Sequence, residues 1–358
     1  MLKSTQTTIY SPVTVRLFFR KPRPTGNTSI EHSFAEMVES FPKNRGFILD
    51  WFESSYFSNG LLPRIRAILE VRRNKAAINH ITGDTNFFVL GLPRRSTILT
   101  ILDCGFMKDK KGFSYWIMKK FWLELPVKNS EIVTAISTAT KQDIIHYTGC
   151  PPEKIKIVPI VIKSSFSYTP KVFRKDYPTI LHVGISPNKN LERHAEAIYG
   201  LPCQLHLIGK LSDEQIALLK KLNIDYKISF NISEQELQKA YEEADILLFC
   251  STIEGFGMPI LEAQTVGRVV ITSTISSMPE VAGEGACFAN PLNTTEIRSA
   301  IDKVIADDKY RNKLIESGLE NVKRFNPENV ALLYSDLYTK IEARQRRIKQ
   351  YTYAHSCR

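Results

Sequence analysis

Residues 244–273 decide the fold, and they read ADILLFCSTIEGFGMPILEAQTVGRVVITS. The unbroken apolar run at 246–249 is typical of a parallel strand that is buried on both faces. A turn bracketed by glycines follows, and Pro259 suits the first turn of a helix because no backbone donor is needed there. Another apolar run begins at residue 269. The stretch therefore predicts one β-α-β unit.

Two carboxylates stand at the ligand-binding edge of this unit. Glu254 follows the first strand, and Glu262 lies one turn into the helix. Ligands of doubly wound sheets bind at this edge, against helix N-termini. Gly255 and Gly257 let the backbone approach a phosphate, whereas the carboxylates would repel it and suit sugar or ribose hydroxyls. The pattern predicts a nucleotide-sugar site, although the spacing alone is equally compatible with a surface glutamate and a solvated helix glutamate.

The sequence EGFGMPILEA at 254–263 resembles the Glu-x7-Glu signature of the retaining glycosyltransferases of family 4, within glycosyl transferases group 1. The flanks YEEAD at 241–245 and SSMPEVAG at 276–283 agree with it, and the resemblance is strong from 179 to 291. It implies the α/β fold called GT-B, in which two Rossmann-like domains face each other across a cleft and a C-terminal helix crosses back to the first. It also implies a retaining hexosyltransferase that uses a nucleotide-diphosphate sugar.

The resemblance assigns roles in the second half of the chain. Glu262 would accept hydrogen bonds from the ribose, Glu254 from the donor sugar, and the intervening amides would meet the diphosphate. Lys189 would neutralise the diphosphate, and Arg193 would replace an arginine that this chain lacks two residues before the turn. The expected donor-binding residues are Gly184, Lys189, Arg193, Gly209, Glu254, Gly255, Phe256, Gly257, Met258 and Glu262.

Retention in the resembling family has no agreed protein nucleophile, so neither carboxylate is assigned that role. Catalysis would consist of stabilising the leaving phosphate and orienting the acceptor. The second half contains no Asp-x-Asp motif. We therefore expect no cofactor and no bound metal.

The first half alternates strand and helix patterns, which predicts a second Rossmann-like domain. A polar stretch at 163–178 reads as the interdomain linker. The expected domains are an acceptor-side domain at 1–172, joined by a final helix at about 329–358, and a donor-binding domain at 173–328. Strands are expected at 13–19, 46–49, 76–82, 97–102, 132–137 and 155–162.

The acceptor side departs from the family pattern. The resembling enzymes commonly end their fourth strand in His-Asp, and here Leu102 precedes Asp103. His80 ends the preceding strand, so we expect Asp103 and His80, with Glu254, to be the catalytic candidates, while a core or turn role for His80 is an open alternative. Gly26 and Asn27 in the first loop and Asp84 are expected on the acceptor side.

The net charge of +11 fits an anionic membrane or phosphorylated substrates, since no nucleic-acid module is recognisable. Residues 108–122 mix lysines 108, 110, 111, 119 and 120 with aromatic residues. That composition predicts a helix at a membrane interface, or else a core helix with solvated lysines. No apolar run is long enough to span a bilayer, and the start has no signal-peptide pattern. The scattered cysteines indicate reduced core thiols, so we expect a cytoplasmic protein, peripheral at the inner face of the cell membrane.

The sequence thus predicts a glycosyltransferase of polysaccharide or glycan assembly that acts on a glycan or lipid-linked acceptor. A catalytically impaired, nucleotide-sugar-binding scaffold subunit is the alternative that Leu102 supports. A GT-B sugar-nucleotide epimerase is a further alternative, although such relatives lack the Gly-Phe-Gly sequence between two glutamates.

Overall fold

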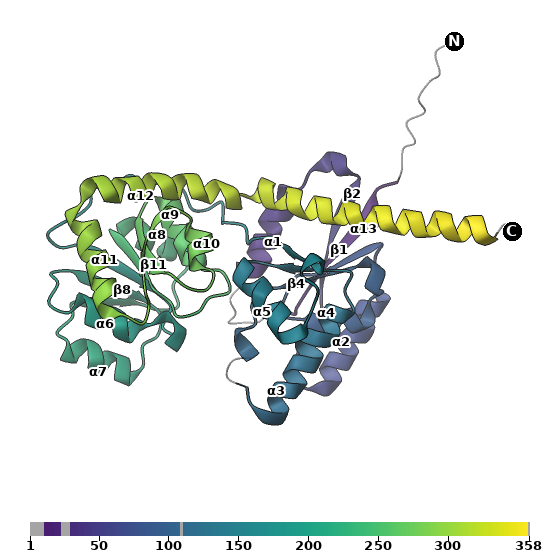
Figure 1. Cartoon of the computed structure of the whole chain (residues 1–358), viewed down its shortest axis with the longest axis horizontal. Helices are drawn as coiled ribbons and strands as arrows, with labels where there is room; N and C mark the ends of the chain where they lie inside the picture. The colour runs from purple at the N-terminus through teal and green to yellow at the C-terminus, as the bar shows by residue number, and fades with distance from the viewer. Residues whose placement is uncertain (1–10, 23–28, 108–109, 357–358) are drawn as a thin grey trace, which may run out of the picture.

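The computed structural model describes residues 11–22, 29–107 and 110–356. Two α/β units lie side by side along the long axis, and each contains a six-stranded sheet whose paired strands are parallel (Figure 1). Because every crossover in such a sheet passes through a helix or loop on its face, the carboxyl ends of the strands share one edge.

The first sheet has the strand order β2-β1-β3-β4-β5-β6. Its strands are β1 (Val13–Phe19), β2 (Phe47–Glu53), β3 (Ile78–Ile81), β4 (Thr97–Ile101), β5 (Ile132–Ala135) and β6 (Ile155–Ile157). The helices of this unit are α1 (Ser29–Glu39), α2 (Leu61–Arg73), α3 (Gly112–Met118), α4 (Leu125–Lys128) and α5 (Thr138–Thr148). A π-helical turn at Lys119–Glu124 joins α3 to α4. The predicted strand at 155–162 is shorter than expected, since Pro159 has no N–H to donate to a sheet.

The second sheet has the order β12-β11-β10-β7-β8-β9. Its strands are β7 (Thr179–Val183), β8 (Gln204–Ile208), β9 (Tyr226–Ser229), β10 (Ile246–Phe249), β11 (Val269–Ser273) and β12 (Ala286–Ala289). The helices of this unit are α6 (Leu191–Ile198), α7 (Asp213–Lys221), α8 (Glu234–Glu243), α9 (Met258–Val266), α10 (Met278–Ala282), α11 (Thr294–Ala306) and α12 (Asp308–Asn321).

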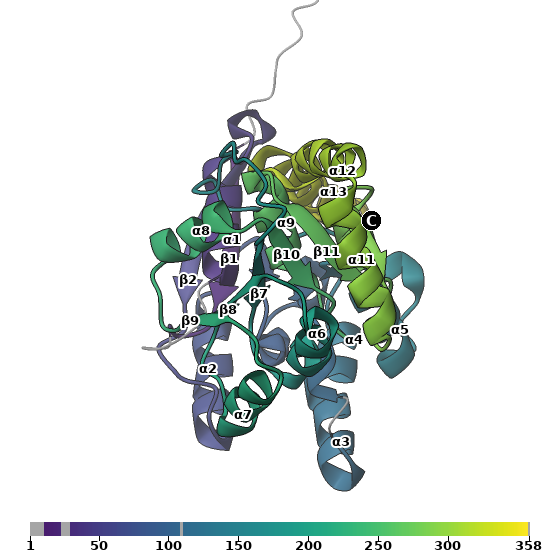
Figure 2. The ribbon, with the colours of Figure 1, turned by 90° about the vertical axis from the view of Figure 1, so that its left-hand side faces the viewer.

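Helices cover both faces of the second sheet, which explains the unbroken apolar sequence of β10. Ile246 and Leu248 pack among residues of α6, α7 and α11, whereas Leu247 and Phe249 pack among residues of α8, α9 and α10 (Figure 2). All four side chains are almost fully buried. Burying such a side chain contributes about 1.5–3 kcal/mol, so β10 is a central element of this unit.

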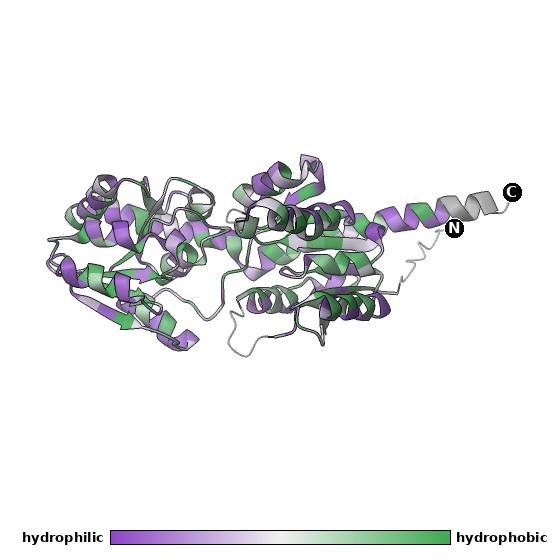
Figure 3. Cartoon of the chain, turned by 90° about the horizontal axis from the view of Figure 1, so that it is seen from below, coloured by the Kyte–Doolittle hydropathy of each residue, from purple (hydrophilic) through white to green (hydrophobic). Residues whose placement is uncertain are grey.

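The final helix, α13 (Pro327–Ser356), returns to the first unit as the resemblance implied. Tyr334, Leu337 and Tyr338 of α13 are buried in the same core cluster as Val15 and Leu17 of β1. Beyond this contact the helix extends past the first sheet, and Figure 3 shows mainly hydrophilic residues there. The two sheets are therefore joined both by the linker and by the path from α12 to α13.

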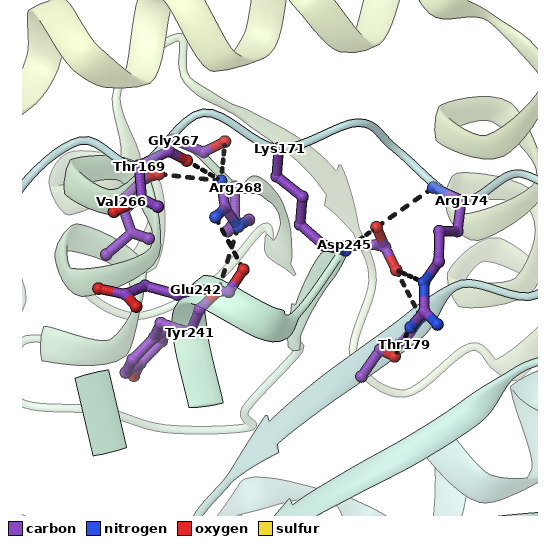
Figure 4. Close-up of polar contacts among 10 residues, drawn as sticks. All are labelled: Thr169, Lys171, Arg174, Thr179, Tyr241, Glu242, Asp245, Val266, Gly267 and Arg268. Atoms are coloured by element: carbon purple, nitrogen blue, oxygen red, sulfur yellow. Dashed lines mark hydrogen bonds and ion pairs between the residues drawn. The ribbon is translucent and has the colours of Figure 1, made fainter. Parts of the chain in front are cut away.

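The linker at residues 158–178 contains no helix or strand, and its later part is fixed to the second unit. Lys171 and Arg174 converge on Asp245, which precedes β10 (Figure 4). The Asp245 side chain is fully buried and also accepts a hydrogen bond from the Thr179 amide at 2.8 Å. Because the Asp245 carboxylate is buried and both of its cationic partners lie in the linker, these ion pairs hold the linker beside β7 and β10.

Candidate functional site

The carboxyl edges of the two sheets face each other, and a cavity of about 560 Å³ lies between them. Its walls come from the segments after β4 and β10, from α5, and from the 3-10 turn Pro187–Lys189. The lining residues are Asp103, Gly105, Phe106, Asp143, Pro187, Asn188, Thr252, Ile253, Glu254 and Gly255. The cavity thus brings together Asp103 and Glu254, two of the residues predicted to be catalytic.

Glu254 is held by one cation and one side-chain amide of the turn after β7, in the same unit. Its Oε1 lies 2.6 Å from Lys189 Nζ and 3.3 Å from Asn188 Nδ2. Lys189 also lies over the Phe249 ring, at 4.7 Å from its centroid. Gly184 makes room for this lysine, because a Cβ there would come within 3.0 Å of the lysine chain. The lysine predicted to bind phosphate therefore neutralises the first signature glutamate.

Glu262 is nearly buried, and its environment is unusual for a carboxylate. Its Oε2 accepts a hydrogen bond of 2.6 Å from the hydroxyl of Tyr241, on α8. Burial raises the pKa of Glu262, while Tyr241 and the charge of Lys163 act in the opposite direction. Burial also raises the pKa of Tyr241 well above its usual value, so this phenol stays a donor at neutral pH. The hydrogen bond from Tyr241 occupies one oxygen of the Glu262 carboxylate.

The other expected donor residues occupy turns at the same edge. Gly209 has a φ of +150°, and a Cβ there would lie 2.8 Å from the Ile185 side chain. Gly257, with a φ of +108°, is the N-cap of α9, whose first residue is Met258. Arg193 donates to Asn190 Oδ1 at 2.9 Å, which directs its guanidinium to the start of α6.

A smaller cavity of about 80 Å³ adjoins on the acceptor side and shares Asp103 and Phe106 with the large one. Asp84 and Trp122 also line it. Asp84 Oδ2 is paired with Arg20 at 2.8 Å. Asp103 Oδ1 accepts from the Gly105 amide at 2.8 Å, which fixes one oxygen of this carboxylate in the turn after β4. Gly26 and Asn27, also predicted on this side, lie outside the described residues.

The expected catalytic role of His80 needs correction, because its side chain lies in the core. Its ring nitrogens contact the Tyr338 hydroxyl at 2.9 Å and the Thr100 hydroxyl at 2.8 Å. Burial lowers its pKa to about 3, so the ring is neutral. The open alternative of a core role therefore describes this histidine. The side chain of Leu102, in the usual histidine place, lines a small apolar cavity of about 20 Å³ with Phe34 and Tyr334.

Four residues of the site region were not expected from the sequence. Asp143 of α5 lines the large cavity, and Tyr241 contacts Glu262. The other two residues connect the two units. Ser137 Oγ donates to the Gly255 carbonyl at 2.8 Å. The Glu280 carboxylate accepts from the Thr138 amide at 2.7 Å. Of the four, only Tyr241 and Glu280 lie in segments that resemble the family's flanking motifs.

Solved structures share this architecture. The sucrose-phosphate synthase from Thermosynechococcus elongatus aligns with a TM-score of 0.73 and 17% identity, covering 92% of this chain and 99% of that one. Anabaena Alr3699/HepE aligns with a TM-score of 0.72 and 14% identity, covering 92% and 100%. At such identities the likeness establishes the fold, which is GT-B.

Sequence comparison finds a family model that matches part of the chain and relatives that are mannosyltransferases. Residues 168–321 match the family described as Glycosyl transferases group 1. This match covers less than half of the chain. The serotype-specific mannosyltransferase WbdA of Escherichia coli is 26% identical over 238 residues, which are 60% of this chain but 29% of WbdA. The O-antigen chain mannosyltransferase B of Escherichia coli is 25% identical over 300 residues, covering 75% of this chain and 77% of the relative. The chain thus spans less than a third of the length of WbdA.

Proposed function

We propose that this chain is a retaining glycosyltransferase that moves a sugar from a nucleotide-diphosphate donor to a glycan acceptor in polysaccharide assembly. The observation that carries the proposal is the cavity between the sheets, which is lined by Glu254 on the donor side and by Asp103 on the acceptor side. Lys189 pairs with Glu254 at 2.6 Å. Carboxylates bind sugar hydroxyls, and a lysine at a helix start binds phosphate. Because the relatives are mannosyltransferases, nucleotide-activated mannose is the first donor to test.

The contacts of Glu254 support the proposed retaining mechanism. Glu254 is tied to Lys189 and Asn188, so it serves better as a hydrogen-bond acceptor than as a nucleophile. The diphosphate leaves toward Lys189 and the N-terminus of α9, where positive charge and the helix dipole stabilise it. The acceptor hydroxyl enters from the side of Asp103 and attacks the anomeric carbon on the face from which the diphosphate leaves, and its proton passes to the departing phosphate oxygen. We expect turnover to persist in a chelator, since no metal is required by this arrangement.

The assay of choice is release of nucleoside diphosphate and transfer of sugar by the purified protein. Glu254→Gln should reduce transfer by about 10- to 150-fold, as for loss of a charge-assisted contact of about 1.5–3 kcal/mol in a transition state. Coupling constants at the anomeric centre of the product report its configuration, which should be the same as that of the donor. Donor binding without turnover would instead favour the scaffold alternative, which Leu102 motivates.

We also propose that the first unit docks on an anionic membrane. Phe113, Trp116 and Phe121 have exposed fractions of 75%, 53% and 44%, and the rings of Phe113 and Trp116 stack at 5.9 Å. On α2, the exposed apolar residues are Leu61, Leu62, Ile65 and Leu69. Arg64 of α2 lies over the Trp122 ring at 4.4 Å, so the two elements adjoin beside the acceptor-side cavity. A lipid-linked acceptor held by this face would reach Asp103.

Basic residues flank these apolar side chains, and two of them form ion pairs with a carboxylate. Lys119 and Lys120 contact Glu124 at 3.6 and 3.0 Å. Lys110 and Lys111 stand just before α3. Lys108 lies outside the described residues. Each cation near an anionic leaflet contributes about 1 kcal/mol. No described helix is both long and apolar enough to cross a membrane. Binding would therefore be peripheral and sensitive to salt.

Co-sedimentation with phosphatidylglycerol vesicles at low and high salt tests this proposal. Wild-type protein should sediment at low salt and be released by high salt. Phe113→Ser with Trp116→Ser should abolish sedimentation, whereas Leu292→Ser, at a 62% exposed apolar position of the second unit, should leave it unchanged. A wild-type protein that stays in the supernatant at low salt would exclude this face as an anchor and favour a soluble glycan acceptor.

A further inference from the structure

The signature loop is held in place by hydroxyl groups from both units. The Gly255 carbonyl accepts from Ser137 Oγ at 2.8 Å and from Thr140 Oγ1 at 3.3 Å. Both residues stand at the N-terminus of α5, which belongs to the first sheet's unit. Thr140 Oγ1 also lies 3.2 Å from the Leu102 carbonyl. The start of α5 therefore contacts both the donor-side loop and the strand end that carries Asp103.

The carbonyls on either side of Gly255 are held from within the second unit. The Glu254 carbonyl accepts from Ser276 Oγ at 2.7 Å and from Ser277 Oγ at 3.1 Å. Ser277 Oγ also lies 2.7 Å from the Phe256 carbonyl. Three consecutive carbonyls of the loop are thus fixed by side-chain hydroxyls, and only the middle one depends on the other unit.

Fixing these carbonyls also fixes the direction of the following amides. In a trans peptide unit the C=O of one residue and the N–H of the next point in opposite directions, and no cis peptide occurs in the described chain. The amides of Gly255, Phe256 and Gly257 therefore point away from the hydroxyls. Among the described residues, none of these three amides donates a hydrogen bond to the protein. Successive unpaired N–H groups before a helix form a site for anions or sugar oxygens.

We propose that Ser137 is a positioning residue of the donor site: by holding the Gly255 carbonyl from the opposite unit, it presents the Phe256 amide to the donor. The inference rests on the proposed function and adds to it a dependence on the docking of the two units. Docking is close at this point, because a Cβ on Gly255 would lie 2.7 Å from the Leu102 carbonyl oxygen. Donor binding and docking of the units then strengthen each other, since coupling between two equilibria is reciprocal.

A second interdomain contact lies beside Ser137. The Glu280 carboxylate accepts from the Thr138 amide at 2.7 Å and from the Thr138 hydroxyl at 3.0 Å. A carboxylate at a helix N-terminus is favoured by the helix dipole. The Glu280 carboxylate holds the start of α5 through Thr138 and, as an acceptor, cannot bond the carbonyls of the signature loop. It therefore supports docking, whereas Ser137 acts on the peptide that carries the amide.

Ser137 is also the N-cap of α5, and its Oγ accepts from the Thr140 amide at 3.1 Å. The test must separate the role of Ser137 as a helix cap from its role as a donor to the Gly255 carbonyl. Glycine is nearly as good an N-cap as serine but has no hydroxyl, and threonine keeps both the cap and the donor. We would measure donor binding by calorimetry for wild type, Ser137→Gly and Ser137→Thr, and compare their thermal unfolding. Calorimetry reports the number of sites separately from affinity, so a misfolded fraction does not mimic weak binding.

The expected result is that Ser137→Gly weakens nucleotide-sugar binding about 5- to 10-fold, as for one lost hydrogen bond, with an unfolding midpoint close to that of wild type. Ser137→Thr should restore the affinity. Equal affinities for the glycine and threonine variants would overturn the proposal and leave Ser137 as a helix cap alone. If Glu254→Gln reduces transfer while Ser137→Gly binds as wild type, this inference fails and the proposed function stands. If wild type binds no nucleotide sugar, both fail.

Discussion

Replacing Lys189 with Met removes the cation that contacts Glu254 and keeps a side chain of similar length. A charge-assisted hydrogen bond contributes about 1.5–3 kcal/mol, which corresponds to about a 10- to 150-fold change in affinity. In the protein without a donor, Lys189 already bonds Glu254 at 2.6 Å, and both side chains are less than one fifth exposed. Because the phosphate must share this lysine with Glu254, we expect a loss in the lower half of that range, about 10- to 40-fold.

The assay is calorimetric titration of the variant with a nucleoside diphosphate and with the matching nucleoside. The diphosphate should bind more weakly to Lys189→Met, while the nucleoside should bind as to wild type. Lys220→Met provides the matched control, because Lys220 is an exposed lysine in the last turn of α7, in the same unit. An equal loss for both ligands, or no loss for the diphosphate, would refute the placement of Lys189 at the phosphate.

Three further outcomes follow from the buried titratable groups. Glu262→Gln keeps the size of the side chain and should raise the donor KM about 10-fold or more with the fold intact, measured by initial rates. Tyr241→Phe removes the 2.6 Å hydrogen bond to Glu262 and should raise the pKa of this carboxylate further. Donor binding requires the ionised form, so on acidification it should be lost at a higher pH than in wild type, as titration calorimetry can show. His80 has its pKa lowered from 6.5 to about 3, so between these values only the unfolded chain binds its proton. The free energy of unfolding should fall as pH falls through that window, by up to about 1.4 kcal/mol per unit, and denaturant titrations of His80→Leu should show a smaller slope.

The elements closest to the signature could be predicted from the sequence because their causes are local. The apolar run of β10, the proline that begins α9 and the glycines of the turn act within a few residues of one another. The return of the final helix came from the family resemblance, since no local pattern places α13 against β1.

Other features depend on contacts that a single sequence does not reveal. His80 ends a strand, as predicted, but it is buried because Tyr338, 258 residues later, lies against it. Ser137 and Asp143 reach the site only because α5 of one unit faces the loop after β10 of the other. Tyr241 stands in a flanking motif, yet its contact with Glu262 depends on how α8 packs beside α9.

The most direct test of the account is turnover of a nucleotide sugar by the purified chain. The protein would be incubated with UDP-, GDP- and ADP-sugars, including activated mannose, and release of nucleoside diphosphate would be followed with and without a glycan acceptor. A donor that binds the native state also raises its unfolding temperature, so a thermal-shift screen identifies which donor to use. The account predicts that one donor stabilises the protein, that its nucleoside diphosphate is released faster with acceptor, and that Glu254→Gln slows the release by about 10- to 150-fold. Stabilisation by a donor with no release under any acceptor would contradict the enzymatic claim.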